Sequence, residues 1–96
     1  MKEIEENETE IISKIIINKE GKSAWDENGY RVHWLVKYSL FFISYSKEYG
    51  GWETLYYEPK TKTYWEREYL NGDLQGGGPP SLFKISEEDA HKKYEF

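Results

Sequence analysis

The stretch between Gly50 and Pro80 constrains the fold of this chain most. Residues 52–57 and 63–70 each alternate in side-chain character, which is the pattern of strands whose successive side chains point to opposite faces. Between them lies a polar segment that begins Glu58-Pro59, and the proline ring fixes φ at the head of a turn. The sequence therefore predicts an antiparallel hairpin at the centre of the fold.

One face of this hairpin is expected to carry an acidic cluster formed by Glu53, Glu66 and Glu68. Paired carboxylates can perform acid–base chemistry when burial separates their pKa values. Charged side chains are far more often exposed on the solvent face of a half-buried sheet. The sequence also offers no motif that would activate a serine nucleophile. We therefore predict a binding protein rather than an enzyme.

Aromatic side chains supply both core and interface candidates in the hairpin. We assign Trp52 and Trp65 to the core, because alternating aromatic residues usually form cross-strand pairs. Tyr56, Tyr57 and Tyr69 are candidates for an interface, where tyrosine is enriched. The same aromatic face also suits a platform that stacks a sugar or a nucleobase, and this alternative stays open.

The N-terminal half predicts a strand followed by the longer helix. Residues 10–17 are rich in isoleucine and end at the glycine-containing segment 18–22, which indicates a strand and a turn. Ser23 and Asp26 then have the spacing of a helix capping box. Segment 27–44 combines an apolar face at helical spacing with an aromatic, β-branched composition. Its length favours a helix over a strand.

Downstream of the hairpin the sequence predicts a turn, a third strand and a short helix. Asn71-Gly72-Asp73 is a strong turn pattern, and Ser81–Ile85 is the expected strand. Ser86 suits a helix N-cap, with Asp89 in the capping-box position. Acidic residues then occupy the first turn of segment 86–94 and lysines the last, which the helix dipole favours.

The glycine run before the third strand differs from a phosphate-binding loop. Such loops lead into a helix N-terminus and hold phosphate with backbone N–H groups and, in the P-loop, a lysine. Here a strand follows, the lysine is missing and prolines remove N–H donors. Glycines permit unusual φ values and prolines stiffen the chain. We therefore assign a structural, shaping role to Gly76, Gly77, Gly78, Pro79 and Pro80, with presentation of a rigid surface to a partner as the alternative.

Together these elements predict an α+β domain: a small, mainly antiparallel sheet, one longer helix packed on it and a short C-terminal helix. At 96 residues the chain is expected to be a single domain, residues 1–96, with residues 1–9 as a frayed acidic lead-in. Only 38% of the residues are hydrophobic, but 18% are aromatic, and these large side chains can fill a modest core.

Charge and cysteine content restrict the possible partners. The net charge is −5 and no basic patch is visible, which weighs against nucleic acid and favours a basic protein partner. The chain has no cysteine and its two histidines lie far apart, so we expect neither a metal site nor a cofactor. The acidic start and the lack of a long apolar run predict a cytoplasmic protein without membrane contact.

Around the central stretch the chain resembles immunity protein family 27, whose members accompany bacterial polymorphic toxins. The resemblance rests on segments that follow one another at similar spacing: Gly51-Trp52-Glu53-Thr54-Leu55-Tyr56, Tyr64-Trp65-Glu66, Tyr69, Gly76-Gly77-Gly78-Pro79-Pro80 and Ile85-Ser86-Glu87-Glu88-Asp89-Ala90. The N-terminal half is similar in outline, with a helix motif at Trp34-Leu35-Val36-Lys37. The chain departs from the family's usual Asp-Pro-Asn-Asp-Gly-like turn at Glu58-Pro59-Lys60-Thr61-Lys62, and from a common Met-His pair at Leu74-Gln75.

The resemblance implies an immunity protein that binds and neutralises a secreted or contact-delivered toxin and so protects the producing cell. Many such toxins are basic nucleases, whose clefts an acidic protein can occupy. Occlusion without catalysis would then involve Glu53, Tyr57, Glu66, Glu68 and Asp73. The alternative function is a small carbohydrate- or nucleotide-binding module that uses the aromatic hairpin face.

Overall fold

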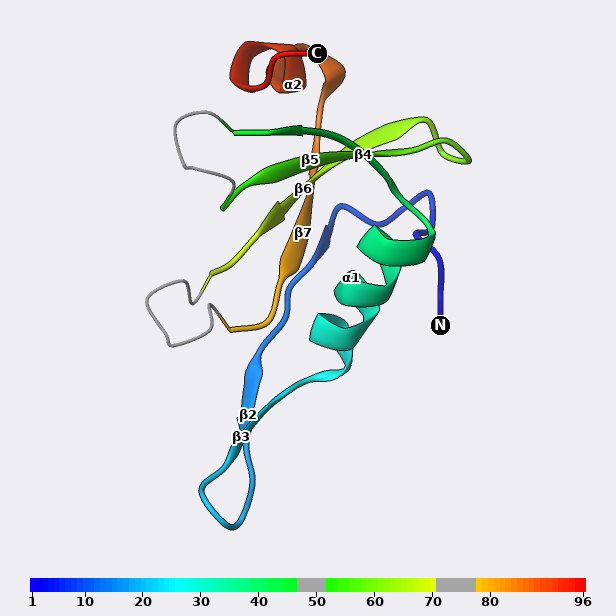
Figure 1. Cartoon of the computed structure of the whole chain (residues 1–96). Coiled ribbons are helices and arrows are strands. Elements are labelled where there is room, and N and C mark those ends of the chain that lie inside the picture. Colours follow the sequence, from blue (N-terminus) through cyan, green and yellow to red (C-terminus); the bar gives the residue numbers. More distant parts are fainter. Residues whose placement is uncertain (47–51, 71–77) are drawn as a thin grey trace.

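The structure is a computed structural model, and it describes residues 1–46, 52–70 and 78–96. The described residues form an α+β fold, as predicted (Figure 1). Its elements in chain order are β1 (Glu10–Ile11), β2 (Ile15–Ile17), β3 (Ser23–Trp25), α1 (Glu27–Tyr38), β4 (Phe41–Tyr45), β5 (Thr54–Glu58), β6 (Thr63–Glu68), β7 (Ser81–Ile85) and α2 (Glu87–Lys93).

The predicted hairpin lies inside an antiparallel sheet of five described strands, in the order β1-β7-β6-β5-β4. Strands β5 and β6 pair with Tyr56 opposite Trp65 and Leu55 opposite Glu66, which confirms the hairpin and its central position. Strand β4 forms one edge of the sheet, next to β5. Strands β2 and β3 pair with each other and extend away from the body as a separate hairpin (Figure 1).

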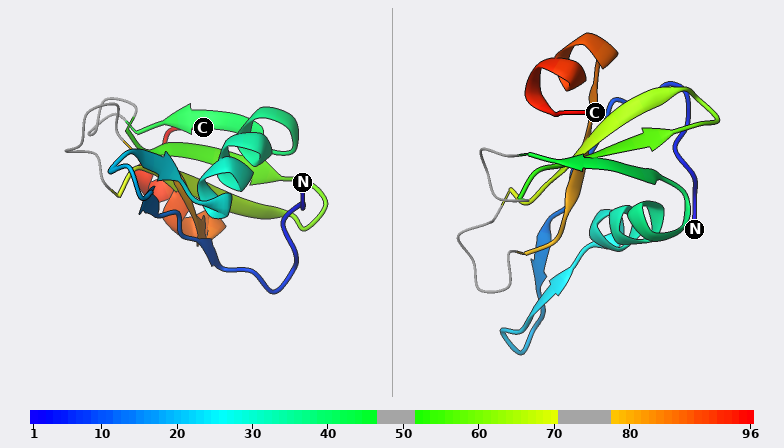
Figure 2. Two further views of the ribbon diagram at one scale, coloured as in Figure 1. Left: turned by 90° about the horizontal axis from the view of Figure 1, so that it is seen from below. Right: turned by 45° about the horizontal axis from the view of Figure 1, so that its top comes forward.

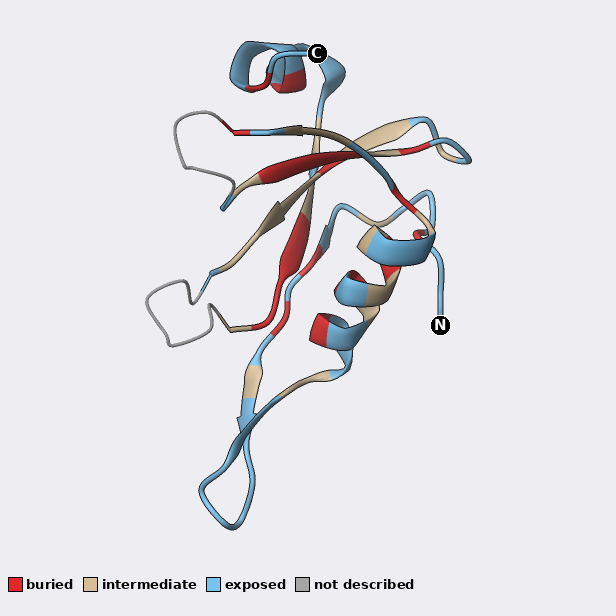
Figure 3. Cartoon of the chain, viewed as in Figure 1, coloured by how far each residue is buried: buried red, intermediate tan, exposed pale blue. Residues whose placement is uncertain are grey.

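The two helices lie on opposite faces of the large sheet (Figure 2). Helix α1 covers the larger core, whose buried members are Ile4, Ile11, Val32, Leu35, Leu40, Tyr56, Trp65 and Leu82. Helix α2 belongs to a smaller core, whose buried members are Leu55, Ala90 and Tyr94. The burial pattern in Figure 3 follows this arrangement, because both helices are buried only along one side. Successive residues of β5 therefore contribute to two different cores.

Helix α1 is shorter than segment 27–44 and begins with a different cap from the one predicted. Asp26 is the N-cap and its carboxylate accepts from the backbone N–H of Gly29 at 2.9 Å, whereas Ser23 lies in β3. The helix ends at Tyr38, and segment 41–45 is strand β4. The longer helix is present, but its predicted extension to residue 44 was wrong, because the aromatic, β-branched end of the segment gains a ladder of hydrogen bonds beside β5.

The strand predicted over residues 10–17 is divided between the two sheets. Ser13, which lies between β1 and β2, is buried, and its backbone N–H donates to Ser81 Oγ at 2.9 Å. Its hydroxyl donates to the carbonyl of Pro79 at 3.1 Å. These bonds replace a strand ladder at the point where the chain leaves the large sheet. The turn at residues 18–22 forms as predicted and joins β2 to β3, with Gly21 at a φ of 77°.

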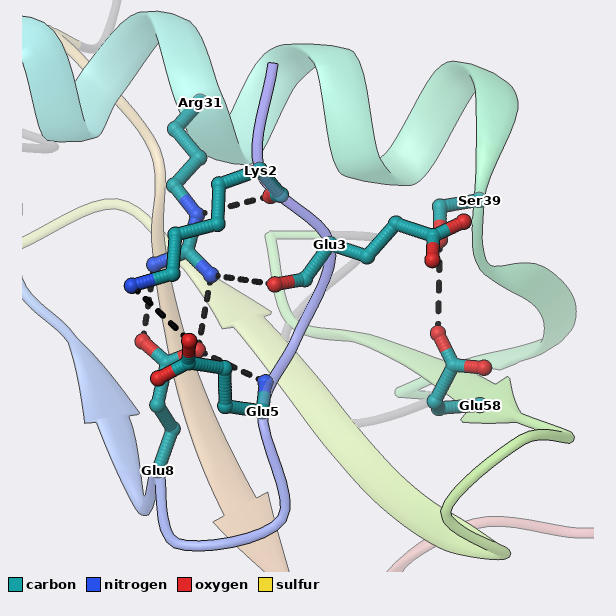
Figure 4. Close-up of polar contacts among 7 residues, drawn as sticks. All are labelled: Lys2, Glu3, Glu5, Glu8, Arg31, Ser39 and Glu58. Atoms are coloured by element: carbon teal, nitrogen blue, oxygen red, sulfur yellow. Dashed lines mark hydrogen bonds and ion pairs between the residues drawn. The ribbon is translucent and has the colours of Figure 1, made fainter.

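Residues 1–9 pack against α1, which corrects the expectation of a frayed lead-in. Ile4 is only 7% exposed and belongs to the larger core. Arg31 of α1 donates to both oxygens of the Glu8 carboxylate at 2.7 Å and to the carbonyl of Lys2 at 2.9 Å (Figure 4). The hydrogen bonds from Arg31 lower the pKa of Glu8 below its ordinary value, although partial burial acts in the opposite direction.

The C-terminal elements match their prediction closely. Strand β7 pairs with β6, and the hydroxyl of Ser86 accepts from the backbone N–H of Asp89 at 3.1 Å. Acidic residues occupy the first turn of α2 and basic residues its last. Within the described ranges, neither helix has the length and apolar character that crossing a bilayer requires.

Candidate functional site

The acidic cluster predicted from the hairpin forms in the structure. Glu66 and Glu68 lie on the α2 side of β6, and Glu53 immediately precedes β5. Carboxylate oxygens of the three residues all lie within 4.8 Å of one another. Such close approach of like charges is unfavourable unless a cation or a proton is shared among them.

Helix α2 supplies the groups that stabilise the cluster. The Lys93 ammonium forms ion pairs with Glu53 and with Glu66, the latter at 2.7 Å. The Tyr94 hydroxyl donates to the same Glu66 oxygen at 2.8 Å. Glu66 therefore attaches α2 to the sheet, and its side chain is only 12% exposed.

The pKa shifts follow from these contacts. Burial raises the pKa of Glu68, and the charges of Glu53 and Glu66 raise it further. Burial alone would lower the pKa of Lys93, but its hydrogen bonds to two carboxylates outweigh that effect and raise it. Burial and the bond to Glu66 raise the pKa of Tyr94. The cluster thus combines three carboxyl groups with one ammonium.

This arrangement suits the attraction of a cation more than acid–base chemistry. Carboxylate oxygens are also the ligands of hard divalent ions. Here the ammonium of Lys93 already occupies a position against Glu53 and Glu66. A basic side chain of a partner protein is a second cation that this cluster can attract.

The remaining predicted contact residues do not join the cluster. Tyr57 lies on the same face of the sheet, opposite Tyr64 and Phe41 rather than beside Glu66. Its ring centroid is 5.0 Å from that of Tyr64. Asp73 lies outside the described residues.

The two tryptophans of the hairpin differ in burial. Trp65 is 1% exposed and belongs to the core beneath α1, as expected. Trp52 is 49% exposed, so its assignment to the core was wrong. The reason is that β5 begins only at Thr54, which leaves Trp52 before the strand, where its ring packs edge-on against Tyr69 at 5.6 Å.

The prolines of the predicted structural motif pack inward. Pro79 and Pro80 are buried, and a Cβ atom built on Gly29 of α1 would lie 2.9 Å from the Cβ of Pro79. Gly78 has a φ of 67°, a left-handed conformation that glycine adopts without strain. Gly76 and Gly77 lie outside the described residues.

Sequence reasoning named Tyr56 and Tyr69 as interface candidates but missed the surface that Tyr69 forms with Arg67 and strand β4, on the α1 side of the sheet. We call it the aromatic–arginine surface, and it comprises Phe42, Tyr45, Trp52, Arg67 and Tyr69, next to the buried Tyr56. Phe42 and Tyr45 lie on edge strand β4, opposite Tyr56 and Thr54. The guanidinium carbon of Arg67 is 5.0 Å from the Tyr69 ring centroid. The signal in the sequence was the position of this arginine on the same strand face as Trp65 and Tyr69.

A family model described as Immunity protein 27 matches residues 18–86, which is more than half of the chain. The searches of curated proteins and of solved structures found no significant match.

Proposed function

The chain belongs to the immunity protein 27 family, and from this we propose that it neutralises a cognate protein toxin by binding it, without catalysis. The acidic cluster of Glu53, Glu66 and Glu68 is the observation that supports a binding site. It holds more carboxylates than cations and lies at the end of the sheet where β5 begins and β6 ends.

A basic toxin surface is the partner that this site favours. Complementary charge raises the association rate and the specificity of a complex more than its affinity. The net charge of −5 adds a long-range attraction for the same basic surface. Toxins that act on nucleic acids have basic clefts, so a nuclease is the toxin class that we propose.

We also place the protein in the cytoplasm, within a polymorphic toxin system that delivers its toxin by secretion or by contact between cells. There the immunity protein would protect the producing cell and its siblings. Tyr57 and Asp73 remain proposed toxin-contact residues.

The test uses the toxin domain encoded beside the gene of this chain. Cells that express this domain should grow only when they also express the immunity protein. The purified pair should bind in a calorimetric titration. Lack of both protection and binding would refute the proposed function.

Charge reversal at Glu68 tests the contact site and leaves Glu66, which bonds Lys93 and Tyr94 of the C-terminal segment, unchanged. We expect Glu68→Lys to slow association by about tenfold at low salt and by much less at high salt, because salt screens steering charges. Glu20→Lys, on the distant turn between β2 and β3, makes the same charge change and should slow association less than about twofold. Stopped-flow kinetics measure both rates, and equal effects of the two substitutions would place the contact elsewhere.

A further inference from the structure

The chain has two arginines, Arg31 and Arg67, and their surroundings differ. Arg31 donates to both oxygens of the Glu8 carboxylate. Arg67 forms no ion pair with a carboxylate in the part of the chain that the structure describes. Arginine is costly to hold partly buried unless its charge and its donors are satisfied.

The guanidinium of Arg67 is held in place by neutral groups. It donates to Thr54 Oγ1 at 3.0 Å and, more weakly, to Tyr56 Oη at 3.4 Å. Its Nε is buried and has no hydrogen-bond partner in the described structure. The Tyr69 ring packs against it. These contacts fix the orientation of the guanidinium, whose charge has no acidic partner among the described residues.

Exposed aromatic residues lie in the neighbouring part of the sheet, where Tyr45 pairs with Thr54 and Thr54 pairs with Arg67. Phe42 is 51% exposed and Tyr45 58%, and their ring centroids lie 4.7 Å apart on edge strand β4. Natural edge strands usually carry charged residues that prevent pairing with other chains. Strand β4 carries none between Phe41 and Tyr45. The edge is therefore apolar where a soluble monomer normally has charge.

We propose that the aromatic–arginine surface is a second toxin-contact surface, in which Arg67 receives an aspartate or glutamate side chain of the toxin. This inference rests on the proposed function. A carboxylate fits the guanidinium in charge and in its two-oxygen geometry. Apolar toxin residues around that carboxylate cover Phe42, Tyr45 and Trp52 and exclude water from the pair. Arginine and aromatic residues in such surroundings contribute most of the binding energy of many interfaces.

The two contact surfaces lie at the same end of the sheet, on opposite faces. Arg67 stands between Glu66 and Glu68 in β6, so alternation of the strand sends the arginine to one face and the two acids to the other. A toxin that encloses this end therefore presents basic groups to the acidic cluster and an acid to Arg67. A protein that lacks either the basic groups or the acid would leave a charge unpaired, so the two surfaces together discriminate the toxin from other partners.

The test compares two substitutions at Arg67 with a control, using the toxin domain named above. We expect Arg67→Met to weaken binding by about a hundredfold, mainly through faster dissociation, and Arg67→Lys by about tenfold, because lysine keeps the charge but lacks the fork. The control Lys92→Met removes an exposed cation on α2 and should change affinity less than about twofold. Denaturant unfolding of each variant establishes that it is folded at the assay temperature.

A double-mutant cycle identifies the partner group. Alanine substitutions at each aspartate and glutamate of the toxin domain are titrated against the wild type and Arg67→Met. Alanine substitution of one toxin acid should weaken binding to the wild type and should have no further effect on binding to Arg67→Met. If the wild type binds the toxin domain and a folded Arg67→Met variant binds it with the same affinity, this inference is overturned. The proposed function would then stand. Absence of wild-type binding would instead refute the proposed function.

A titration with ADP addresses the small-molecule alternative. Trp52 packs against Tyr69, so a nucleotide on this surface would change tryptophan fluorescence. Saturable ADP binding that Arg67→Met abolishes would overturn the proposal in favour of a nucleotide site. Unchanged fluorescence is the result that we expect.

Discussion

A single residue of the central hairpin adopts an unfavourable backbone conformation. Lys62, in the turn between β5 and β6, has a φ of 58°, the left-handed region that side chains with a Cβ atom rarely occupy. The resemblance to the family places glycine at this position of the usual turn. Left-handed strain of about 1–2 kcal/mol exceeds the extra unfolded-state entropy of glycine, about 0.4–1 kcal/mol.

We therefore expect Lys62→Gly to raise the free energy of unfolding by about 0.5–1 kcal/mol. Urea denaturation at neutral pH measures the change. Lys60→Gly is the control in the same turn, because positive φ is not found at that residue. It should lower stability, and a gain at both positions would show that strain at Lys62 is not the cause.

Burial of single residues could be predicted only where the strand bounds were right. Trp65 lies in the middle of β6, where alternation assigns its face, and it is buried as predicted. Trp52 has the same alternation but precedes the strand, and propensity does not locate strand ends to within two residues. The acidic cluster was found because Glu66 and Glu68 also lie within β6. Arg67 was not singled out, because a missing acid partner is a property of three-dimensional surroundings.

At the scale of elements, helix α1 and the segment before β7 are in close contact at a glycine, Gly29. Gly29 is buried in α1, and an added Cβ would lie 2.9 Å from the Cβ of Pro79 and 3.2 Å from that of Trp25. In an exposed helix, glycine to alanine would stabilise by about 1 kcal/mol. Here neither neighbour has a flexible end that can move away.

We expect Gly29→Ala to lower the free energy of unfolding by about 1–3 kcal/mol, as overpacking of a core does. Lys37→Ala, at an exposed position of the same helix, should change it by less than about 0.5 kcal/mol. Thermal and denaturant unfolding measure both variants. A gain in stability for Gly29→Ala would mean that α1 and Pro79 are not in close contact.

The elements predicted best were those with local signals at both ends. Helix α2 has a serine N-cap, an acidic first turn and a basic last turn, and it forms where predicted. Helix α1 lacks a stop signal after Tyr38, because Ser39 and Leu40 interrupt neither the apolar spacing nor the composition. Its end is set by the pairing of β4 with β5, which is a tertiary contact. The split of residues 10–17 likewise depends on Ser13 bonding to Ser81, far along the chain.

At the scale of the whole molecule, the fold class followed from the sequence but the placement of the helices did not. Strand β5 carries large side chains on both faces, Leu55 on one and Tyr56 on the other. This pattern shows that both faces are covered without showing which helix covers which. Packing of α2 on the far face brings Lys93 and Tyr94 to the acidic cluster. The proposed contact site therefore depends on an arrangement that the sequence alone leaves undetermined.

The acidic cluster should lower the stability of the molecule while it favours the complex. Burial and then the charges of Glu53 and Glu66 raise the pKa of Glu68, so the folded state binds this proton more tightly than the unfolded state. The stabilising contribution of the protonated group is complete below the ordinary glutamate value of 4.5 and is lost as pH rises through the raised value. A neutral side chain at this position removes the burial cost and the repulsion that the ionised form of Glu68 experiences.

We expect Glu68→Gln to raise the free energy of unfolding at neutral pH by about 0.5–1 kcal/mol, with the gain disappearing below about pH 4. The same substitution should slow association with the toxin domain at low salt, because the attracting charge is gone. Urea denaturation across pH and stopped-flow kinetics measure the two effects. Glu87→Gln, an exposed acid at the start of α2, is the matched control and should give no gain in stability. We expect the substitution to raise stability and to slow association, as for a charge that serves binding at the expense of stability. A stabilised variant with an unchanged association rate would show that Glu68 has no role in binding.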